Sequence, residues 1–185
     1  MTTETAMMHL PPEPERALEV AGRVANAHAA AALFSDYRSR RAPNTLRRQD
    51  NALALFARYL SAAGIPDALE AVELAADPAA WRGVTWGLVA GFARWLLGQG
   101  YAIGTVNGAL STVKVYARLA MQAGSLDRAE YVALRTVQGY GHTEGKRVDE
   151  ARPAARVGAK KAEPVPLSWE QIHRLKSQPN TPQGR

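Results

Sequence analysis

Residues 104–122 read GTVNGALSTVKVYARLAMQ and decide the fold expected of this 185-residue chain. Apolar side chains recur there every three or four positions, which predicts an amphipathic helix from about Thr105 to Gln122. Gly124 follows and marks the end of the helix. The expected buried face comprises Val106, Leu110, Val113, Ala117 and Ala120. An apolar face of this length needs neighbouring helices to cover it, so the segment predicts a helical bundle.

Two further helices are expected upstream of this segment. Pro43 suits the first position of a helix, where its missing N–H costs nothing, and Gly64 ends the apolar pattern that follows. A helix that is apolar nearly all round, as the central helix of a bundle should be, is expected from about Thr85 to Gly98. Residues 65–84 between them predict a connector with one short helical turn at Pro78–Trp81, capped by Asp77.

The ends of the domain are marked less sharply. Residues 14–41 are rich in Ala, Leu, Glu and Arg and predict one or two helices. Asp127 begins a capping-box pattern for a short helix after the one that ends at Gln122. No segment alternates with period two, so residues 15–138 predict an all-α fold, a small bundle of four to five helices.

The remaining segments differ in composition from the bundle. Residues 1–14 are polar and are expected to be mobile. Residues 139–166 carry Gly, Pro and charge without apolar periodicity, which predicts a flexible basic linker. Ser168 to Gln171 form a capping box, so residues 167–185 predict one helix that opens a second, truncated domain. The basic residues of the linker are Lys146, Arg147, Arg152, Arg156, Lys160 and Lys161.

Charge is unevenly distributed along the chain. The sequence has 23 Lys and Arg against 17 Asp and Glu, a net charge of +6. Between Phe34 and Pro66 there are six arginines against Asp36 and Asp50, whereas residues 67–80 carry four acids and no base. Such segregation favours a polyanionic partner more than net charge alone does.

A polar stripe runs along the helix expected at 105–122, opposite its apolar face. Small hydroxyls, an amide and two cations share it, a combination that allows a helix to bind base edges and phosphates in a major groove. The alternative is the solvated face of a bundle helix. The residues on or near this stripe are Thr105, Asn107, Ser111, Thr112, Lys114 and Arg118.

The helix that begins at Pro43 repeats this pattern in its first two turns. Cations at a helix N-terminus oppose the macrodipole, so the arginines there are explained by a phosphate or base partner better than by local stability. Solvated charge is again the alternative. Three arginines just upstream, Arg38, Arg40 and Arg41, are expected to extend the same surface. The residues of this group are Arg40, Arg41, Asn44, Thr45, Arg47, Arg48 and Asn51.

Several functional classes lack their signatures. No Gly-rich phosphate loop, Ser/His/Asp set or pair of catalytic carboxylates is present, so we expect no catalytic residue and no cofactor. The chain has no cysteine and its four histidines are scattered, which argues against a metal site. Neither a signal peptide nor a stretch able to span a membrane is evident, so a cytoplasmic protein is expected.

The order of these segments resembles the N-terminal half of the tyrosine recombinases, the phage integrase family. The resemblance covers roughly residues 26–180 and rests on the order and spacing of short motifs. These are APNT (42–45) before LALFARYL (53–60), AGFARWL (90–96), GTVN (104–107) before LSTVK (110–114), and PLSWEQI (166–172).

The resemblance implies a SAM-like core-binding domain that grips one face of double-stranded DNA, followed by a linker and the start of a catalytic domain. It puts Thr45, Arg47, Arg48, Asn107, Ser111 and Lys114 at the DNA, with Lys160 and Lys161 in the basic linker. The parent protein would carry out site-specific recombination and DNA integration through a 3′-phosphotyrosine, together with other protomers assembled on DNA. None of the family's catalytic residues maps onto this chain, which is therefore expected to bind DNA and cut nothing.

Two other functions fit the same residues. A stand-alone helical regulator would bind DNA without any catalytic domain, and residues 167–185 would then be a tail. A helical protein–protein adaptor would carry merely solvated basic faces, and it would bind DNA weakly whichever arginine were removed.

Overall fold

The computed structural model describes residues 17–65, 69–151, 157 and 166–177. Within these ranges the chain is all-α, with eight α-helices, one 3-10 helix and no strand. The elements are α1 (Ala17–Ser39), α2 (Pro43–Ala62), α3 (Ala71–Ala76), η1 (Pro78–Trp81), α4 (Trp86–Gly98), α5 (Ile103–Gln122), α6 (Arg128–Thr136), α7 (His142–Ala151) and α8 (Trp169–Lys176). None of the described helices combines the length and apolar composition needed to cross a membrane.

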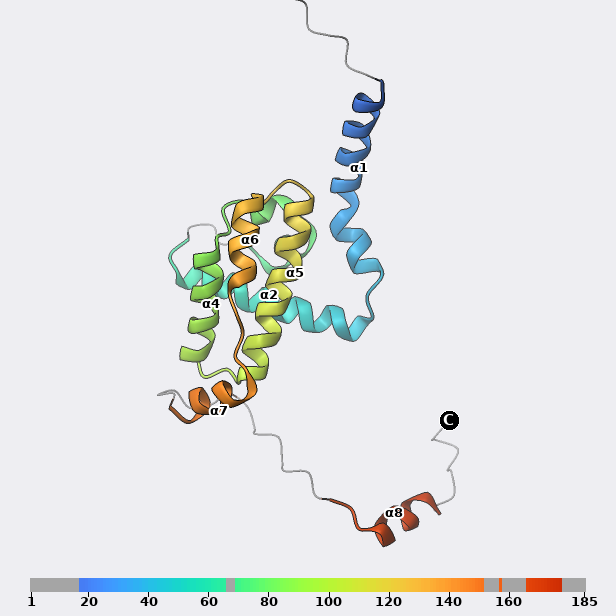
Figure 1. The fold of residues 1–185 in the computed structure, drawn as a ribbon, viewed down its shortest axis with the longest axis vertical. Coiled ribbons are helices and arrows are strands. Elements are labelled where there is room, and N and C mark those ends of the chain that lie inside the picture. Colours follow the sequence, from blue (N-terminus) through green and yellow to red (C-terminus); the bar gives the residue numbers. More distant parts are fainter. Residues whose placement is uncertain (1–16, 66–68, 152–156, 158–165, 178–185) are drawn as a thin grey trace, which may run out of the picture.

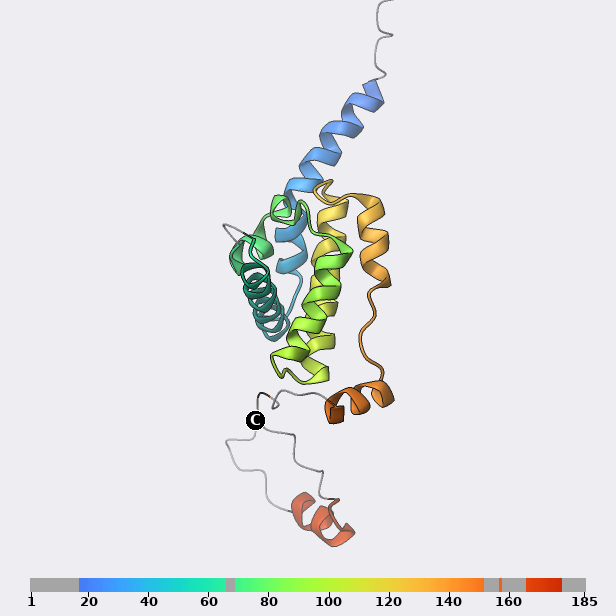
Figure 2. The same ribbon diagram turned by 90° about the vertical axis from the view of Figure 1, so that its left-hand side faces the viewer.

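Helix α5 is the centre of the bundle. It lies beside α4 and α6, and α2 crosses it on another side (Figure 1). In the view of Figure 2, α2 is seen almost end-on, while α4, α5 and α6 run along the height of the bundle. Nine of the twenty α5 residues are buried, including all five of the expected apolar face. The prediction of an amphipathic helix is confirmed. The central position was instead expected of the helix at 85–98, and that expectation is wrong, since α4 leaves Trp86 51% exposed.

Aromatic rings tie the connector between α2 and α4 into the core. Trp81, at the end of η1, is fully buried and stacks on Phe56 of α2 and on Tyr116 of α5, with ring centroids 5.9 and 6.2 Å apart. Its indole N–H donates to the Leu74 carbonyl at 2.9 Å. The expected turn at Pro78–Trp81 is confirmed, and Asp77 caps it by accepting from the Ala79 N–H at 2.7 Å.

Helix α3 was not expected from the sequence. It occupies six residues of the predicted connector and is closed at its start by Glu70 and Glu73, which form a capping box. Glutamate is an unusual residue for the first position of such a box, so the pattern does not stand out in the sequence. Leu74 and Ala75 are buried, and the helix packs against α1, α2 and η1.

A polar network joins α1 to α2 and α5. Arg38 donates to both carboxylate oxygens of Asp50, at 2.7 and 3.3 Å, and to the Tyr116 hydroxyl at 3.0 Å. The hydrogen bond to Asp50 raises the pKa of Arg38 above its usual range. Close by, Gln49 donates through its amide nitrogen to the Tyr37 hydroxyl at 2.7 Å. These bonds orient the start of α2 relative to the core. The expectation that Arg38 extends the positive surface is therefore wrong, because Asp50 neutralises its charge.

Helix α1 is a single helix whose two halves differ. Its last turns pack on the bundle through Phe34 and Tyr37, whose rings meet Tyr116 edge-on at centroid distances of 5.4 and 5.8 Å. Its first half stands clear of the bundle (Figures 1 and 2). Leu18 and Val24 there are 83% and 65% exposed.

The helix boundaries follow the expected signals closely. Gly64 and Gly124, which end α2 and α5, have φ angles of 78° and 76°, a conformation that glycine adopts without strain. Asp127 caps α6 by accepting from the Ala129 and Glu130 amides. The second half of the expected capping box is absent, because the Glu130 carboxylate accepts from the Trp86 N–H at the start of α4, at 3.2 Å.

The predicted linker is wrong in its described part, which contains helix α7. Gly145 is the one residue of α7 that is buried, and a Cβ there would lie 3.0 Å from the side chain of Ile103. A helix that packs through a glycine leaves no apolar periodicity in the sequence. Farther along, the Val157 N–H donates to the Gly100 carbonyl at 2.9 Å. The predicted mobile segment, residues 1–14, lies outside the described residues.

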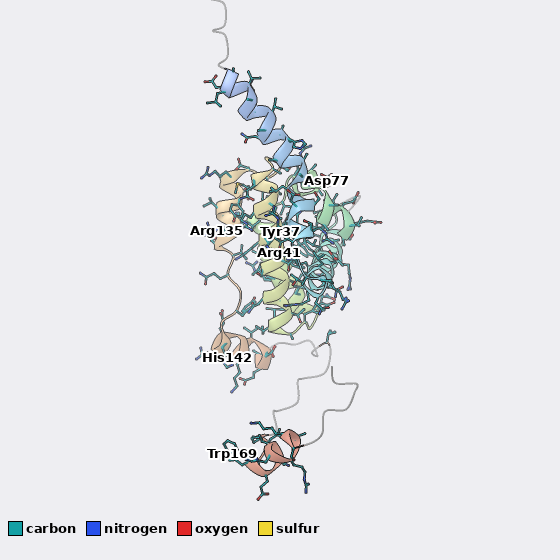
Figure 3. All side chains as sticks on the ribbon, turned by 90° about the vertical axis from the view of Figure 1, so that its right-hand side faces the viewer. Tyr37, Arg41, Asp77, Arg135, His142 and Trp169 are labelled. Atoms are coloured by element: carbon teal, nitrogen blue, oxygen red, sulfur yellow. The ribbon has the colours of Figure 1, made fainter. Side chains whose placement is uncertain are left out.

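Helix α8 begins with the expected capping box. The Ser168 hydroxyl oxygen accepts from the backbone N–H of Gln171 at 3.3 Å. The Gln171 side-chain oxygen accepts from the backbone N–H of Ser168 at 2.9 Å. No residue of α8 is buried, and Trp169 is 76% exposed. Figure 3 shows Trp169 well away from the bundle.

The Arg38 network leads to a stability prediction. Arg38→Ala should lower the free energy of unfolding by roughly 1–2 kcal/mol, because hydrogen bonds to charged groups contribute about that much and solvent partly screens this pair. Arg40→Ala is the control, since Arg40 is exposed and makes no interaction with the other described residues. Urea denaturation of both variants checks this. Equal stabilities for the two variants would show that the network does not hold α1 to the bundle.

Candidate nucleic-acid interface

The two helices that were expected to contact DNA form one groove. The side chains of α2 and α5 enclose a hollow of about 410 Å³. Polar residues from the first turns of both helices line it, although the two helices lie far apart in the sequence. The predicted interface residues that line the groove are Thr45, Arg48, Asn51, Thr105, Ser111 and Thr112.

The groove carries positive charge that nothing nearby neutralises. A guanidinium nitrogen of Arg48 lies 3.8 Å from where a Cβ on Gly108 would stand, so Arg48 reaches across to α5. Arg48 is exposed and forms no ion pair within the described part of the chain. None of the described residues that line the groove is acidic. The nearest acid in sequence, Asp50, is paired with Arg38.

Both helices reach the groove without a capping side chain. Ala42 and Ala102 are the N-cap residues of α2 and α5, and neither supplies an acceptor to the amides of the first turn. Thr45 and Thr105 are the third residues of these helices. Pro43 has no N–H, and the backbone amides of Thr45 and Thr105 donate to the Ala42 and Ala102 carbonyls, at 2.9 and 2.8 Å. What favours a nearby anion is the positive end of each helix dipole. The groove is thus suited to phosphate oxygens.

Not every lining residue is available to a partner. Thr112 is only 8% exposed, and its hydroxyl donates to the Gly108 carbonyl at 3.1 Å. Its expected contact with DNA does not fit this geometry, because the bond turns the hydroxyl into its own helix. The side chains of Thr45, Asn51, Thr105 and Ser111 make no hydrogen bond with the other described residues. These four remain candidates.

The other cations lie around the groove or away from it. Arg47 lies on the exposed face of α2 and donates to Asn44 at 3.2 Å. Arg118 is exposed, four turns along α5. Arg40 and Arg41 line a separate hollow of about 230 Å³ that also contains Asp36. The Arg41 guanidinium carbon lies 4.5 Å from the centroid of the Tyr37 ring, and Figure 3 shows the two residues side by side. Lys160 and Lys161 fall outside the described residues.

Asn107 has a different partner from the one expected. Its amide nitrogen donates to the Tyr140 carbonyl at 2.8 Å, and its oxygen accepts from the Tyr140 N–H at 2.8 Å. The donor and acceptor that would read an adenine edge are therefore both occupied by backbone.

Lys114 is likewise engaged within the protein. Its ammonium donates to the carbonyls of Arg135, at 3.3 Å, and Val137. Burial and the neighbouring Arg135 guanidinium lower the pKa of Lys114. The predicted polar stripe of α5 is therefore divided: Asn107 and Lys114 face the chain after α6, while Ser111 faces the groove.

Gln49 is a groove residue that sequence analysis missed. It is 8% exposed, and its side-chain oxygen has no hydrogen-bond partner. A buried acceptor without a donor is costly, so a donor from water or a ligand would stabilise the floor of the groove. The only signal in the sequence is its position one turn after Thr45, which is too weak to single it out.

Other kinds of site find no support. Among the described residues no group of three His, Asp or Glu side chains is placed to hold a metal ion. No family model matches the chain, and neither curated proteins nor solved structures give a match. The assignment of function therefore rests on the site itself.

The uncapped end of α5 gives a prediction with two opposite effects. Ala102→Asp should raise the free energy of unfolding by about 0.5–1 kcal/mol, because it supplies the missing cap. The same carboxylate should weaken binding of a DNA duplex, because it places negative charge beside the groove. Thermal unfolding and fluorescence anisotropy measure the two effects. Ala102→Ser is the control, which adds the cap without charge; equal DNA affinities for the two variants would place the end of α5 away from DNA.

Proposed function

We propose that this chain binds double-stranded DNA through the α2/α5 groove, as the DNA-gripping N-terminal portion of a tyrosine recombinase. The observation that carries the proposal is the convergence of two polar helix starts on one groove. Four of its polar side chains and Arg48 have no partner among the described residues. None of the described residues that line the groove is acidic, so none would repel a phosphate.

The groove residues divide into two roles in this proposal. Arg48 in the groove holds phosphates together with the two helix ends and with Arg47, which lies outside the groove on the exposed face of α2. These contacts set the position of the protein on the duplex. Asn51 replaces Asn107 as the side chain that reads a base edge, because its amide is exposed and unpaired within the described residues. Thr45, Thr105 and Ser111 donate to phosphate or sugar oxygens.

The proposed parent protein performs site-specific recombination and DNA integration, with other protomers as partners on DNA. In this proposal residues 17–138 are the SAM-like core-binding domain and α8 opens the catalytic domain. The support is that α8 has a complete capping box but exposes Leu167, Trp169 and Leu175. An eight-residue helix with an exposed apolar side is marginal alone and needs a domain to pack on. Strand cleavage needs residues other than those of this chain.

The DNA-binding proposal predicts a salt-dependent affinity for duplex DNA. Arg47→Ala/Arg48→Ala should flatten the slope of log affinity against log salt by about two units, because each phosphate contact contributes about 0.9. Fluorescence anisotropy with a labelled random duplex over a salt series measures the slope.

The matched control removes two arginines that lie outside the groove. Arg82→Ala/Arg94→Ala changes net charge equally, and both side chains are exposed. If the two double variants flatten the slope equally, the binding is diffuse and the adaptor becomes the better proposal. Binding that needs the groove but prefers no sequence would support phosphate contacts alone.

Base reading is tested separately on a preferred site selected from a random library. Asn51→Ala should cost about 1–3 kcal/mol on that site and relax the preference at one base pair. Asn107→Ala should leave the sequence preference unchanged, because its amide is held by Tyr140. A loss of preference in the Asn107 variant, with none in the Asn51 variant, would reverse these roles.

A further inference from the structure

The chain between α6 and α7 is bound along α5. Residues 137–141 form this connection, named here the strap. Figure 3 labels Arg135, near the end of α6, and His142, at the start of α7, on either side of the strap. The strap has no regular structure, so its backbone groups need partners from elsewhere.

Two polar side chains of α5 hold the strap. Asn107 bonds both the N–H and the carbonyl of Tyr140, each at 2.8 Å. Lys114, two turns along the same helix, donates to the carbonyls of Arg135 and Val137 and so closes the C-terminus of α6. A cation there interacts favourably with the helix dipole. The two contacts fix both ends of the strap.

The backbone fits closely around this arrangement. A Cβ on Gly139 would lie 2.5 Å from the Asn107 side-chain oxygen, a distance at which one of the two must move. A Cβ on Gly141 would meet nothing within 4 Å. The close approach is therefore specific to Gly139 and does not extend along the whole strap.

The strap brings α7 beside the candidate interface. Asn107, Tyr140, Lys146 and Gly104 line a hollow of about 380 Å³, and Gly104 also lines the α2/α5 groove. Gly104, near the N-terminal end of α5, thus lies between the two hollows. Lys146 and Arg147 are exposed on α7.

The acidic residues of α7 do not all face this surface freely. Glu144 accepts from the Gly141 N–H at 3.3 Å and so closes the start of α7. Asp149 also has a partner within the protein. Glu150 is exposed at the far end of α7. Lys146 and Arg147 are the two cations of the helix, and Lys146 lines the hollow together with Asp149.

We propose that Asn107 and Lys114 are positioning residues, which latch the strap to α5 so that Lys146 and Arg147 extend the DNA-binding face of the groove. The inference rests on the proposed DNA binding. It gives the two residues an indirect part in that function, because they act through α7 and touch neither phosphates nor bases.

The test opens the latch without changing charge. Gly139→Ala drives a methyl group against Asn107, and Gly141→Ala is the matched control in the same strap. Hydrogen exchange should be at least about tenfold faster for the amides of α7 in Gly139→Ala, because local opening exposes them, and unchanged in α2 and α4. Lys114→Ala provides a second way to loosen the strap. Unchanged hydrogen exchange in both variants would refute the claim that Asn107 and Lys114 hold the strap on α5.

DNA affinity then tests the role of α7 through a double-mutant cycle. Lys146→Ala/Arg147→Ala should flatten the salt slope by up to about two units. Gly139→Ala should lower the affinity by itself but add nothing in the Lys146→Ala/Arg147→Ala background. Additive losses, or full affinity in Gly139→Ala with a loosened α7, would overturn the positioning role.

The two levels of the proposal fail in different ways. If the wild-type chain binds no duplex at low salt, the proposed function fails and the positioning role fails with it. The exchange data would still decide whether Asn107 and Lys114 hold the strap. If Arg47→Ala/Arg48→Ala weakens binding while Lys146→Ala/Arg147→Ala does not, the groove function stands and the contribution of α7 is refuted.

Discussion

The burial of α5 is the constraint on which the rest of the structure depends. The helix is covered by α2, α4 and α6 on different sides, and Tyr116 joins the aromatic stack through Trp81 to Phe56. Apolar burial is the main favourable term in folding, and eight of the 24 buried apolar residues in the described chain lie on α5. Any shift of α5 would therefore displace the core, the groove and the strap together.

This central position explains how a small bundle can present a defined surface. Helix α5 cannot rotate about its own axis, because its apolar residues are packed in the core. Its polar side chains therefore keep their directions. One edge of the helix forms the groove with α2, where Arg48 crosses to Gly108. The other edge holds the strap through Asn107 and Lys114. A binding face carried by rigid elements loses little conformational freedom when a partner binds.

Local signals predicted the elements better than their partners. Asp77, Asp127 and Ser168 cap helices as expected, because a capping bond joins residues two or three positions apart. Helices α3 and α7 escaped prediction because one starts with a glutamate cap and the other packs through Gly145. Asn107 and Lys114 looked like a solvent-facing stripe, since the backbone that they bind lies more than twenty residues away.

The sequence by itself determined that the chain is helical, where its main helices begin and end, and which face of α5 is apolar. These properties depend on contacts within one or two helical turns, which a linear pattern records. Only the tertiary structure decided which polar residues remain available to a partner. Packing joined Thr45 and Thr105 in one groove, buried Thr112 and engaged Asn107, because hydrogen bonding between distant segments depends on how the helices cross.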